Sequence, residues 1–227
     1  MPLCVYAIVA GRPSRRALAR ARLPRLRFVS AGAVSAVVAE CDGKTPVSAR
    51  ALRGHDAIVR RVARVVSAVL PARFGTIVES ESSVVSLLEQ WSGQLRDALA
   101  LVDRREQMTL RLFATGTDRP ARPDTQEQQD DPAHPGTSFL QRRAREQAGP
   151  AAPELEILRE VFKPIVTAER VVRHDQDSLI LTAYHLIPRG GAAAYRRLLR
   201  RHAATPGTRA VASGPWPPYG FVPELRR

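Results

Sequence analysis

Residues 179–187 read Leu-Ile-Leu-Thr-Ala-Tyr-His-Leu-Ile, and they determine the fold of the second half of the chain. Apolar side chains occupy both odd and even positions of this run. A strand with one face in water alternates apolar and polar residues, whereas a strand covered on both faces does not. The run therefore predicts a central strand, and its neighbours in the sequence indicate the kind of sheet.

The elements around this strand follow a regular order. A strand at 165–172 precedes it, and a helix at 192–202 and a strand at 208–213 follow it. Helical stretches are predicted further back, at 137–146 and 154–162. Before them, alternating apolar side chains predict a strand that begins at Glu106; they are Met108, Leu110 and Leu112. The order is β-α-β-β-α-β, that of a modified ferredoxin-like sandwich.

The first half of the chain is predicted to hold three strands and then two long helices. The strands are expected at 3–9, 26–30 and 34–39. A helix begins at about Ser48, has apolar residues at steps of three and four, and is stopped by Pro71. Ser80 precedes a second helix over residues 81–102, which is expected to place Trp91 in the core.

A change of pattern near Asp103 separates the two halves, because helical spacing stops there and strand alternation begins. We therefore predict an N-terminal α+β domain at 1–103 and a C-terminal α+β domain at 104–227. Residues 114–134 contain no large aliphatic or aromatic side chain. They are predicted to form a mobile loop of the second domain.

The composition is typical of a folded globular protein, with 44% hydrophobic and 25% charged residues among 227. The apolar run at 3–10 is far shorter than the roughly 20 residues that a membrane span needs, and no basic stretch precedes it. We expect a cytoplasmic protein without membrane contact. Cys4 and Cys41 lack metal-ligand spacing and are expected to be reduced residues of the core.

The formal net charge is +13, and nearly all of the excess is arginine because Lys44 and Lys163 are the only lysines. The densest basic cluster extends from Arg12 to Arg27 and contains no acidic residue. It is interpreted either as a solvated basic segment or as a docking surface for a polyanion or an acidic protein face. Aromatic residues are only 5% of the chain, which argues against recognition of single-stranded nucleic acid.

Catalytic motifs are missing from the sequence: it has no Gly-x-Gly-x-x-Gly, P-loop, His-Glu-x-x-His or Gly-x-Ser-x-Gly. His174, Asp175 and His185 could bind a divalent metal, but Asp-Gln-Asp-Ser between two strands is ordinary turn chemistry. His55 lies on an apolar helix face and is interpreted as a structural histidine. We expect no catalytic residue, cofactor or metal, and so no enzyme.

Two unusual stretches remain. Residues 70–76 read Leu-Pro-Ala-Arg-Phe-Gly-Thr, in which Arg73 either binds a carboxylate or phosphate or ties the helix end to Glu79 or Glu81. Residues 214–221 read Gly-Pro-Trp-Pro-Pro-Tyr-Gly-Phe, and their prolines predict stiff polyproline II. The aromatic rings of this segment are expected to pack within the chain as a staple; a Pro-x-x-Pro ligand for a partner's aromatic groove is the alternative.

Four stretches in this order resemble the gas vesicle proteins of the GvpL/GvpF family: 5–9, His55 with 69–76, 135–140 and 214–221. The last stretch is highly specific. Beyond the opening strand, the resemblance depends mainly on His55, Pro71, Arg73, Phe74, Gly75, Thr76, Pro135, Gly136, Gly214, Pro215, Trp216, Pro217, Pro218, Tyr219 and Phe221.

Several positions depart from the family pattern. Ala72 stands where methionine is usual, Phe139 where tyrosine is usual and Gly220 where serine is usual. The strand that begins at Glu106 lacks the tryptophan expected there. These are packing substitutions, and they leave open whether the role is F-like or L-like.

The resemblance implies a minor, non-enzymatic protein needed for gas vesicle assembly, with two α+β domains and no cofactor. The implied partners are the small hydrophobic shell protein, of the GvpA type, and other minor gas vesicle proteins. An open edge of the second-domain sheet, or the surface around Trp216 and Tyr219, is our hypothesis for the contact. A basic nucleic-acid-binding protein that uses the cluster from Arg12 to Arg27 is the alternative, and a small enzyme is a weaker one.

Overall fold

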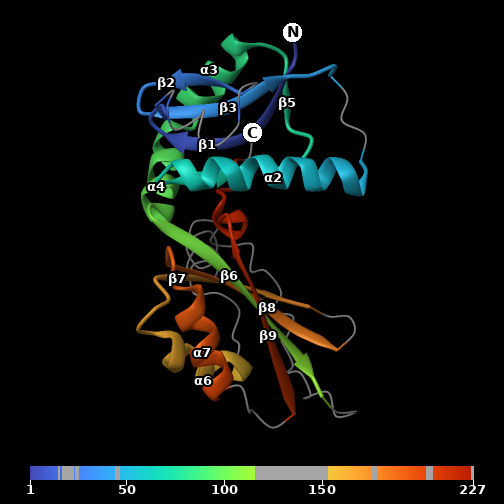
Figure 1. Cartoon of the computed structure of the whole chain (residues 1–227), viewed down its shortest axis with the longest axis vertical. Helices are drawn as coiled ribbons and strands as arrows, with labels where there is room; N and C mark the ends of the chain where they lie inside the picture. Colours follow the sequence, from blue (N-terminus) through green and yellow to red (C-terminus); the bar gives the residue numbers. More distant parts are fainter. Residues whose placement is uncertain are drawn as a thin grey trace, which may run out of the picture. The chain divides into compact units, whose positions relative to one another are not determined.

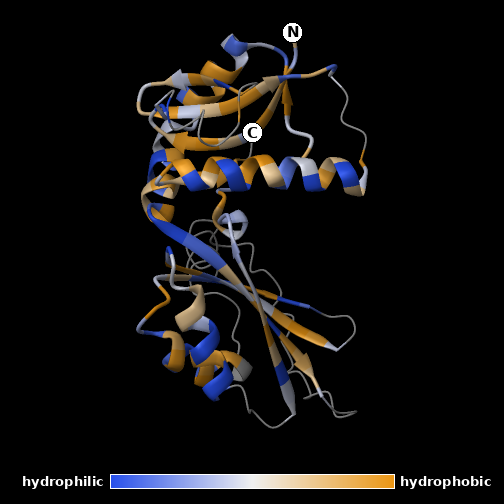
Figure 2. Cartoon of the chain, viewed as in Figure 1, coloured by the Kyte–Doolittle hydropathy of each residue, from blue (hydrophilic) through white to orange (hydrophobic). Residues whose placement is uncertain are grey.

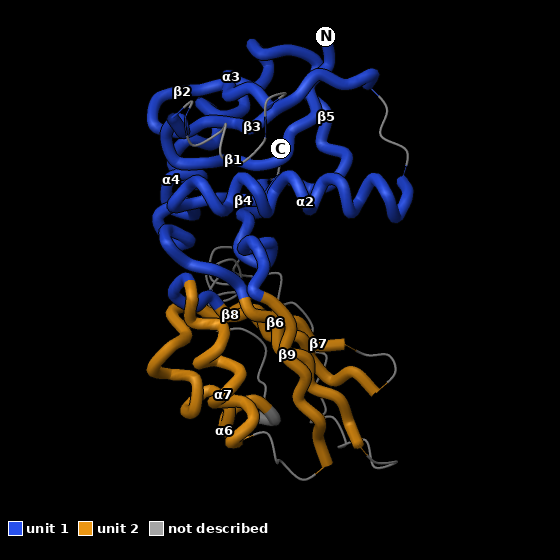
Figure 3. The backbone as a smooth tube through the Cα atoms, viewed as in Figure 1, with its two compact units in different colours: residues 1–107, 186–189, 215–227 blue, residues 108–185, 190–214 orange. Residues whose placement is uncertain are grey.

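The computed structural model describes residues 1–14, 16, 23, 26–43, 47–115, 153–174, 178–202 and 207–225. The fold is α+β with two antiparallel sheets, so the α+β class that we predicted is confirmed (Figure 1). By its internal contacts the chain separates into two compact units (Figure 3). The first unit contains residues 1–107, 186–189 and 215–227, and the second contains residues 108–185 and 190–214.

The first unit is built on a sheet in which β1 pairs with three other strands. Its strands are β1 (Leu3–Ala10), β2 (Arg27–Ala31), β3 (Val34–Glu40), β4 (Val69–Pro71) and β5 (Ile77–Val78). Their order is β2-β3-β1-β4, and β5 also pairs with β1. The hairpin between β2 and β3 turns at Gly32, whose φ of +57° is easily adopted by glycine. The three predicted strands are confirmed.

Helices cover both faces of this sheet. They are α2 (Ala49–Val65), α3 (Glu81–Gln90) and α4 (Ser92–Val102). Ser48 and Ser80 cap α2 and α3, each accepting a hydrogen bond from a backbone N–H at 3.1 Å. The first five positions of β3 are all buried, so both of its faces are covered. Figure 1 shows α2 on one side of the sheet and α3 on the other.

Both helices predicted in the first unit differ from expectation. The first was expected to reach Pro71 but ends at Val65, because β4 forms next and pairs with β1. Sheet pairing there overrides helical spacing. The second breaks into α3 and α4 at Trp91, whose backbone has φ −105° and ψ 13°. Trp91 is therefore only partly buried, and its predicted place in the core is wrong.

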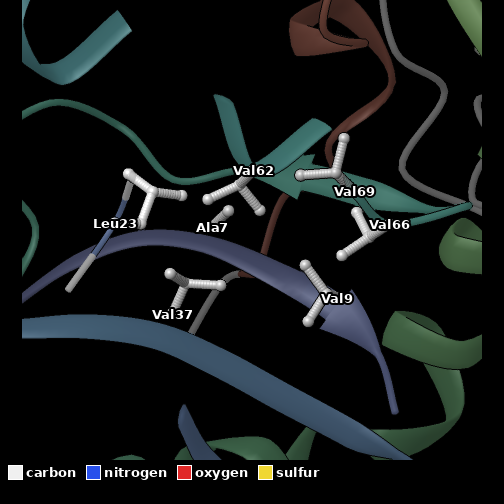
Figure 4. Close-up of a cluster of buried hydrophobic side chains, with 7 residues drawn as sticks. All are labelled: Ala7, Val9, Leu23, Val37, Val62, Val66 and Val69. Carbon is white, nitrogen blue, oxygen red and sulfur yellow. The ribbon is translucent and has the colours of Figure 1, made fainter. Parts of the chain in front are cut away.

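The core between α2 and the sheet is aliphatic. Figure 4 shows the buried side chains that meet there: Ala7, Val9, Leu23, Val37, Val62, Val66 and Val69. Hydrophobic and hydrophilic residues alternate along α2, as expected of a helix with one face on a sheet (Figure 2). Val62 is fully buried, and burial of such a side chain contributes about 1.5–3 kcal/mol.

A bulge in β1 directs two neighbouring side chains toward α2. The register of β1 against β3 shifts between Val5 and Ala7. In a regular strand Tyr6 and Ala7 would point to opposite faces. Here Tyr6 stacks on His55, and Ala7 packs in one cluster with Val62, so both contact α2.

The second sheet, most of which belongs to the second unit, contains the strands β6 (Arg105–Ala114), β7 (Ala168–Arg173), β8 (Leu179–Pro188) and β9 (Thr208–Trp216), in the order β7-β8-β6-β9. Backbone hydrogen bonds from Ala114 to Ser178 and from His174 to Ile180 show the antiparallel pairing. The helices α6 (Pro153–Phe162) and α7 (Ala192–His202) contact each other and lie on one side of this sheet (Figure 1).

The predicted central strand is confirmed, because β8 lies between β7 and β6. The helix predicted at 192–202 has the observed bounds. The predicted helix at 137–146, and the predicted loop at 114–134 from residue 116 onward, lie outside the described residues. In the described ranges, no helix is both long and apolar enough to cross a membrane.

The compact units are not continuous in sequence. Their boundary at Gln107 is near the one predicted at Asp103, but residues 215–227 belong to the first unit by their contacts. A division into two independently folding domains stays a prediction. Cys4 and Cys41 form no disulfide and are only partly buried, unlike the core residues that we predicted, because Cys4 lines an open groove and Cys41 follows the end of β3.

Candidate functional site

The C-terminal signature segment is held by one turn of α2. The Arg60 guanidinium lies over the Trp216 ring at 4.3 Å, and the Tyr219 hydroxyl donates a hydrogen bond of 3.1 Å to Asp56. Asp56 and Arg60 also pair with each other at 2.6 Å. Burial, with the nearby Asp56 carboxylate, raises the pKa of Tyr219 well above its ordinary value, so its hydroxyl stays a donor. All of these residues belong to the first unit.

The prolines of this segment form a tight turn and do not continue as polyproline II. Pro218 has φ −77° and ψ 62°, and the Tyr219 N–H bonds to the Pro217 carbonyl at 2.8 Å. These are the marks of an inverse γ-turn. The short 3₁₀ helix η1 (Tyr219–Phe221) follows, and the Gly220 N–H donates to the Gln107 side chain at 2.7 Å. The predicted polyproline II from Pro215 to Pro218 is therefore wrong.

The remaining residues of the C-terminal signature have structural surroundings. Pro217 and Pro218 are buried, Pro215 is exposed and Phe221 is partly buried. Gly214 has φ +122°, which favours glycine, and its carbonyl accepts a hydrogen bond from Arg196 within the second unit.

The second signature, residues 70–76, forms a turn that His55 holds against α2. His55 Nε2 donates to the Ala72 carbonyl at 3.1 Å, which places the proton on that nitrogen when the ring is neutral. The His55 ring stacks on Tyr6, with 5.2 Å between centroids, and meets the edge of Phe74 at 5.7 Å. Burial lowers the pKa of His55 although the carbonyl bond and Asp56 oppose this shift.

The turn itself depends on its polar residues. The Thr76 hydroxyl donates to the Arg73 carbonyl at 2.7 Å, and Gly75 has a φ of +81°. Pro71 is buried in β4. The Arg73 side chain is exposed and pairs with no described carboxylate, while Glu81, suggested as its partner, pairs with Arg27 at 3.2 Å.

The second signature, together with α2 and β1, borders an open groove of about 260 Å³, which we call the α2–β1 groove. One wall is α2, and the other is β1 with the turn at 74–76. Its lining residues are Cys4, Val5, Tyr6, Ala51, Gly54, His55, Ile58, Phe74, Gly75 and Thr76.

The second unit contains a buried polar cluster that sequence reasoning missed. His185 is 1% exposed, its Nδ1 lies 2.7 Å from the Tyr195 hydroxyl, and its Nε2 lies 3.0 Å from Glu169. Arg159 also bonds Glu169, at 2.8 Å, and Phe162 stacks on Tyr195 at 4.2 Å. A histidine inside a buried strand needs polar partners, so the position of His185 in the apolar run at 179–187 was a sign in the sequence that such a cluster exists.

The electrostatics of this cluster are settled by its hydrogen bonds. Burial would raise the pKa of Glu169, but bonds from His185 and Arg159 lower it on balance. Burial raises the pKa of Tyr195 above its ordinary value. An open cavity of about 310 Å³ lies beside the cluster.

Other residues that drew attention in the sequence have separate positions. His174 bonds Thr182 at 2.9 Å, while Asp175, Pro135 and Gly136 lie outside the described residues. In the part of the chain that the structure describes, no group of three His, Cys, Asp or Glu residues could hold a metal ion. Much of the basic cluster from Arg12 to Arg27 is also outside the described ranges.

Comparisons with known proteins agree with this architecture. Residues 3–223 match the family model of the gas vesicle synthesis protein GvpL/GvpF. Gas vesicle protein L of Streptomyces sp. (strain CB03234) is 27% identical over 192 residues, which cover 77% of this chain and 69% of that protein.

Two solved structures share the fold. The GvpF crystal structure from Anabaena sp. PCC7120 has a TM-score of 0.70 at 16% identity and covers 99% of this chain and 97% of its own. That of GvpF from Microcystis aeruginosa has a TM-score of 0.68 at 15% identity and covers 98% and 99%.

The family match over residues 3–223, on a two-sheet α+β fold, places the protein in the gas vesicle class. The chain belongs to the GvpL/GvpF gas vesicle protein family. Membership gives it a role in gas vesicle formation.

Proposed function

We propose that this protein is a non-enzymatic assembly factor that binds the small hydrophobic shell protein of the gas vesicle. The proposal rests on one observation: the side chains of the family signatures make contacts within the chain. His55, Trp216 and Tyr219 direct their polar or aromatic groups into contacts within the chain and so shape a surface. This use fits a scaffold that presents a binding face better than a catalytic site.

The physical need for such a factor follows from the shell. Subunits that polymerise into a gas-tight wall are prone to aggregate before assembly, because they expose apolar surface and strand edges. A protein that covers those surfaces reversibly would hold or deliver the subunits. The proposal includes other minor gas vesicle proteins as partners, a cytoplasmic location on the vesicle, and no cofactor.

The proposal extends to the fold of the second unit. We assign it to the ferredoxin-like class, modified by the long segment between β6 and α6. The order β6-α6-β7-β8-α7-β9 and the sheet order β7-β8-β6-β9 support this assignment. The outer strands β7 and β9 are then open edges, and they remain candidates for shell-protein contact beside the surface around Trp216 and Tyr219.

The test is co-purification of the tagged full chain from cells that make vesicles, with and without nuclease. We expect the shell protein to be recovered in both samples and to be identified by mass spectrometry. Recovery of nucleic acid alone, lost after nuclease, would instead support the basic nucleic-acid-binding alternative. Recovery of neither shell protein nor a sibling gas vesicle protein would contradict the proposal.

A further inference from the structure

The α2–β1 groove has a lining that suits an apolar chain segment. Its walls contain the Tyr6 and Phe74 rings and the Ile58 side chain, and none of its lining residues is acidic. His55 lies between the two rings, with its Nε2 bonded to the Ala72 carbonyl. A partner would therefore meet mainly apolar surface on these walls.

Gly54, on the α2 wall, has no explanation within the chain. Glycine inside a helix is unfavourable relative to alanine, because it loses more backbone freedom on folding. A Cβ at Gly54 would meet nothing within 4 Å, and the residue has no positive φ that would require glycine. The absence of a side chain leaves the groove open at this point, so a partner's backbone can approach α2 closely.

The exposed margin of the groove is basic. Arg50 and Arg61 lie four residues before and seven residues after Gly54, spacings that place them on its side of the helix. Arg73 immediately precedes Phe74, which lines the opposite wall. All three side chains are exposed, and none pairs with a carboxylate among the described residues. The adjacent Asp56 is already bonded to Arg60 and Tyr219.

The geometry points to a docking site in which the α2–β1 groove binds an apolar segment of the shell protein that carries carboxylates at its margins. Apolar residues fill the groove beside Gly54, and the carboxylates pair with Arg50, Arg61 and Arg73. This inference rests on the proposed function and names the surface and the chemistry of the segment that it binds. A nucleic acid fits less well, because the His55 ring is covered by Tyr6 and Phe74 and the walls are apolar.

A glycine pair in this chain provides the test. Gly54→Leu fills the groove, whereas Gly93→Leu makes the same change in α4, where a Cβ also meets nothing within 4 Å but the residue does not line the α2–β1 groove. Leucine favours helix over glycine, so both variants should fold at least as well as the wild type. The probes are fluorescent 15-residue peptides that tile the shell protein.

We expect Gly54→Leu to weaken peptide binding about tenfold or more and Gly93→Leu to leave it unchanged. The peptides that bind should combine apolar residues with at least two carboxylates. The double variant Arg50→Glu and Arg61→Glu should weaken binding about fivefold or more, and the matched pair Arg197→Glu and Arg200→Glu on α7 should not. Equal binding by both glycine variants, or a preference for basic peptides, would overturn the docking site.

Cys4 reports on the groove separately, because it is in the lining and Cys41→Ser leaves it as the single thiol. A bound peptide should slow its alkylation by N-ethylmaleimide about tenfold. Protection by duplex DNA and not by peptide would overturn the inference in favour of nucleic acid. If co-purification succeeds while Gly54→Leu does not weaken peptide binding and peptides do not protect Cys4, the groove is not the docking site and the proposed function stands. If no shell protein is recovered, the proposed function itself fails.

Discussion

The molecule has two aromatic clusters centred on histidine, one in each compact unit, and they differ in how far the histidine is buried. Both clusters border an open pocket, but His55 is only partly buried, whereas His185 is 1% exposed. We call the cluster around His55 the open cluster and the cluster around His185 the closed cluster. His55 makes one hydrogen bond to a carbonyl, and both ring nitrogens of His185 have side-chain partners. The comparison teaches that the residues predicted as a family signature, His55 and Phe74 among them, lie in the open cluster, while the histidine with more hydrogen bonds is the buried one.

The largest effect expected from breaking this comparison is in the closed cluster. His185→Ala should destabilise the protein by about 3 kcal/mol, because it leaves Glu169 and the Tyr195 hydroxyl without their buried partner. Calorimetric unfolding of the full chain measures the loss. His174→Ala is the matched control, since His174 has one partner and is only partly buried, and it should cost about 1 kcal/mol. Equal losses of unfolding free energy in the two variants would mean that the burial of His185 and its second hydrogen bond add no stability.

The next effect concerns the anchor on the opposite side of α2 from the groove. Trp216→Ala should destabilise the first unit by about 2 kcal/mol, through lost ring burial and the lost contact with Arg60. Tyr219→Phe, which removes only the bond to Asp56, should cost about 0.5–1 kcal/mol. Urea unfolding followed by far-UV circular dichroism measures both. If Trp216→Ala folds normally and retains full shell-protein binding, the surface around Trp216 is not the docking site.

The smallest effect is a pH dependence of the open cluster. Burial lowers the pKa of His55, so between that pKa and about 6.5 the folded chain binds fewer protons than the unfolded chain. The stability that the neutral His55 ring contributes is fully present above about pH 6.5 and declines as the pH falls below that value. Urea midpoints between pH 8 and 5 should therefore fall less for His55→Phe, which keeps a ring on Tyr6. Parallel profiles for the two proteins would remove His55 as the titrating group.

Much of the fold was predictable because local patterns and tertiary structure agree. The run at 179–187 has apolar residues at both odd and even positions, and β8 is indeed a central strand. The pattern failed where tertiary pairing overrides it: residues of β4 have helical spacing, yet they pair with β1. The break at Trp91 was hidden for a related reason, because apolar spacing continues from α3 into α4.

The candidate site was predictable only in part. The C-terminal aromatic residues were expected to pack within the chain, and their contacts with Arg60 and Asp56 agree with that expectation. Those partners are about 160 residues away in sequence, and no local pattern can identify contacts at such separation. The cluster around His185 was missed for a different reason: Tyr195 and Glu169 are only 10 and 16 residues away, but they lie on other elements, and spacing along the sequence does not show which side chains meet across elements.

The return of the C-terminal segment to α2 has a consequence for synthesis. Residues 108–214 separate Gln107 from the segment that completes the first unit. At about 5–20 residues per second, a ribosome needs roughly 5–20 seconds to make them. During that interval α2 is present while Asp56 and Arg60 lack Trp216 and Tyr219. A nascent chain interrupted before residue 215 therefore carries an incomplete first unit. The contacts of Trp216 and Tyr219 with α2 can form only in a chain that has been translated past these residues.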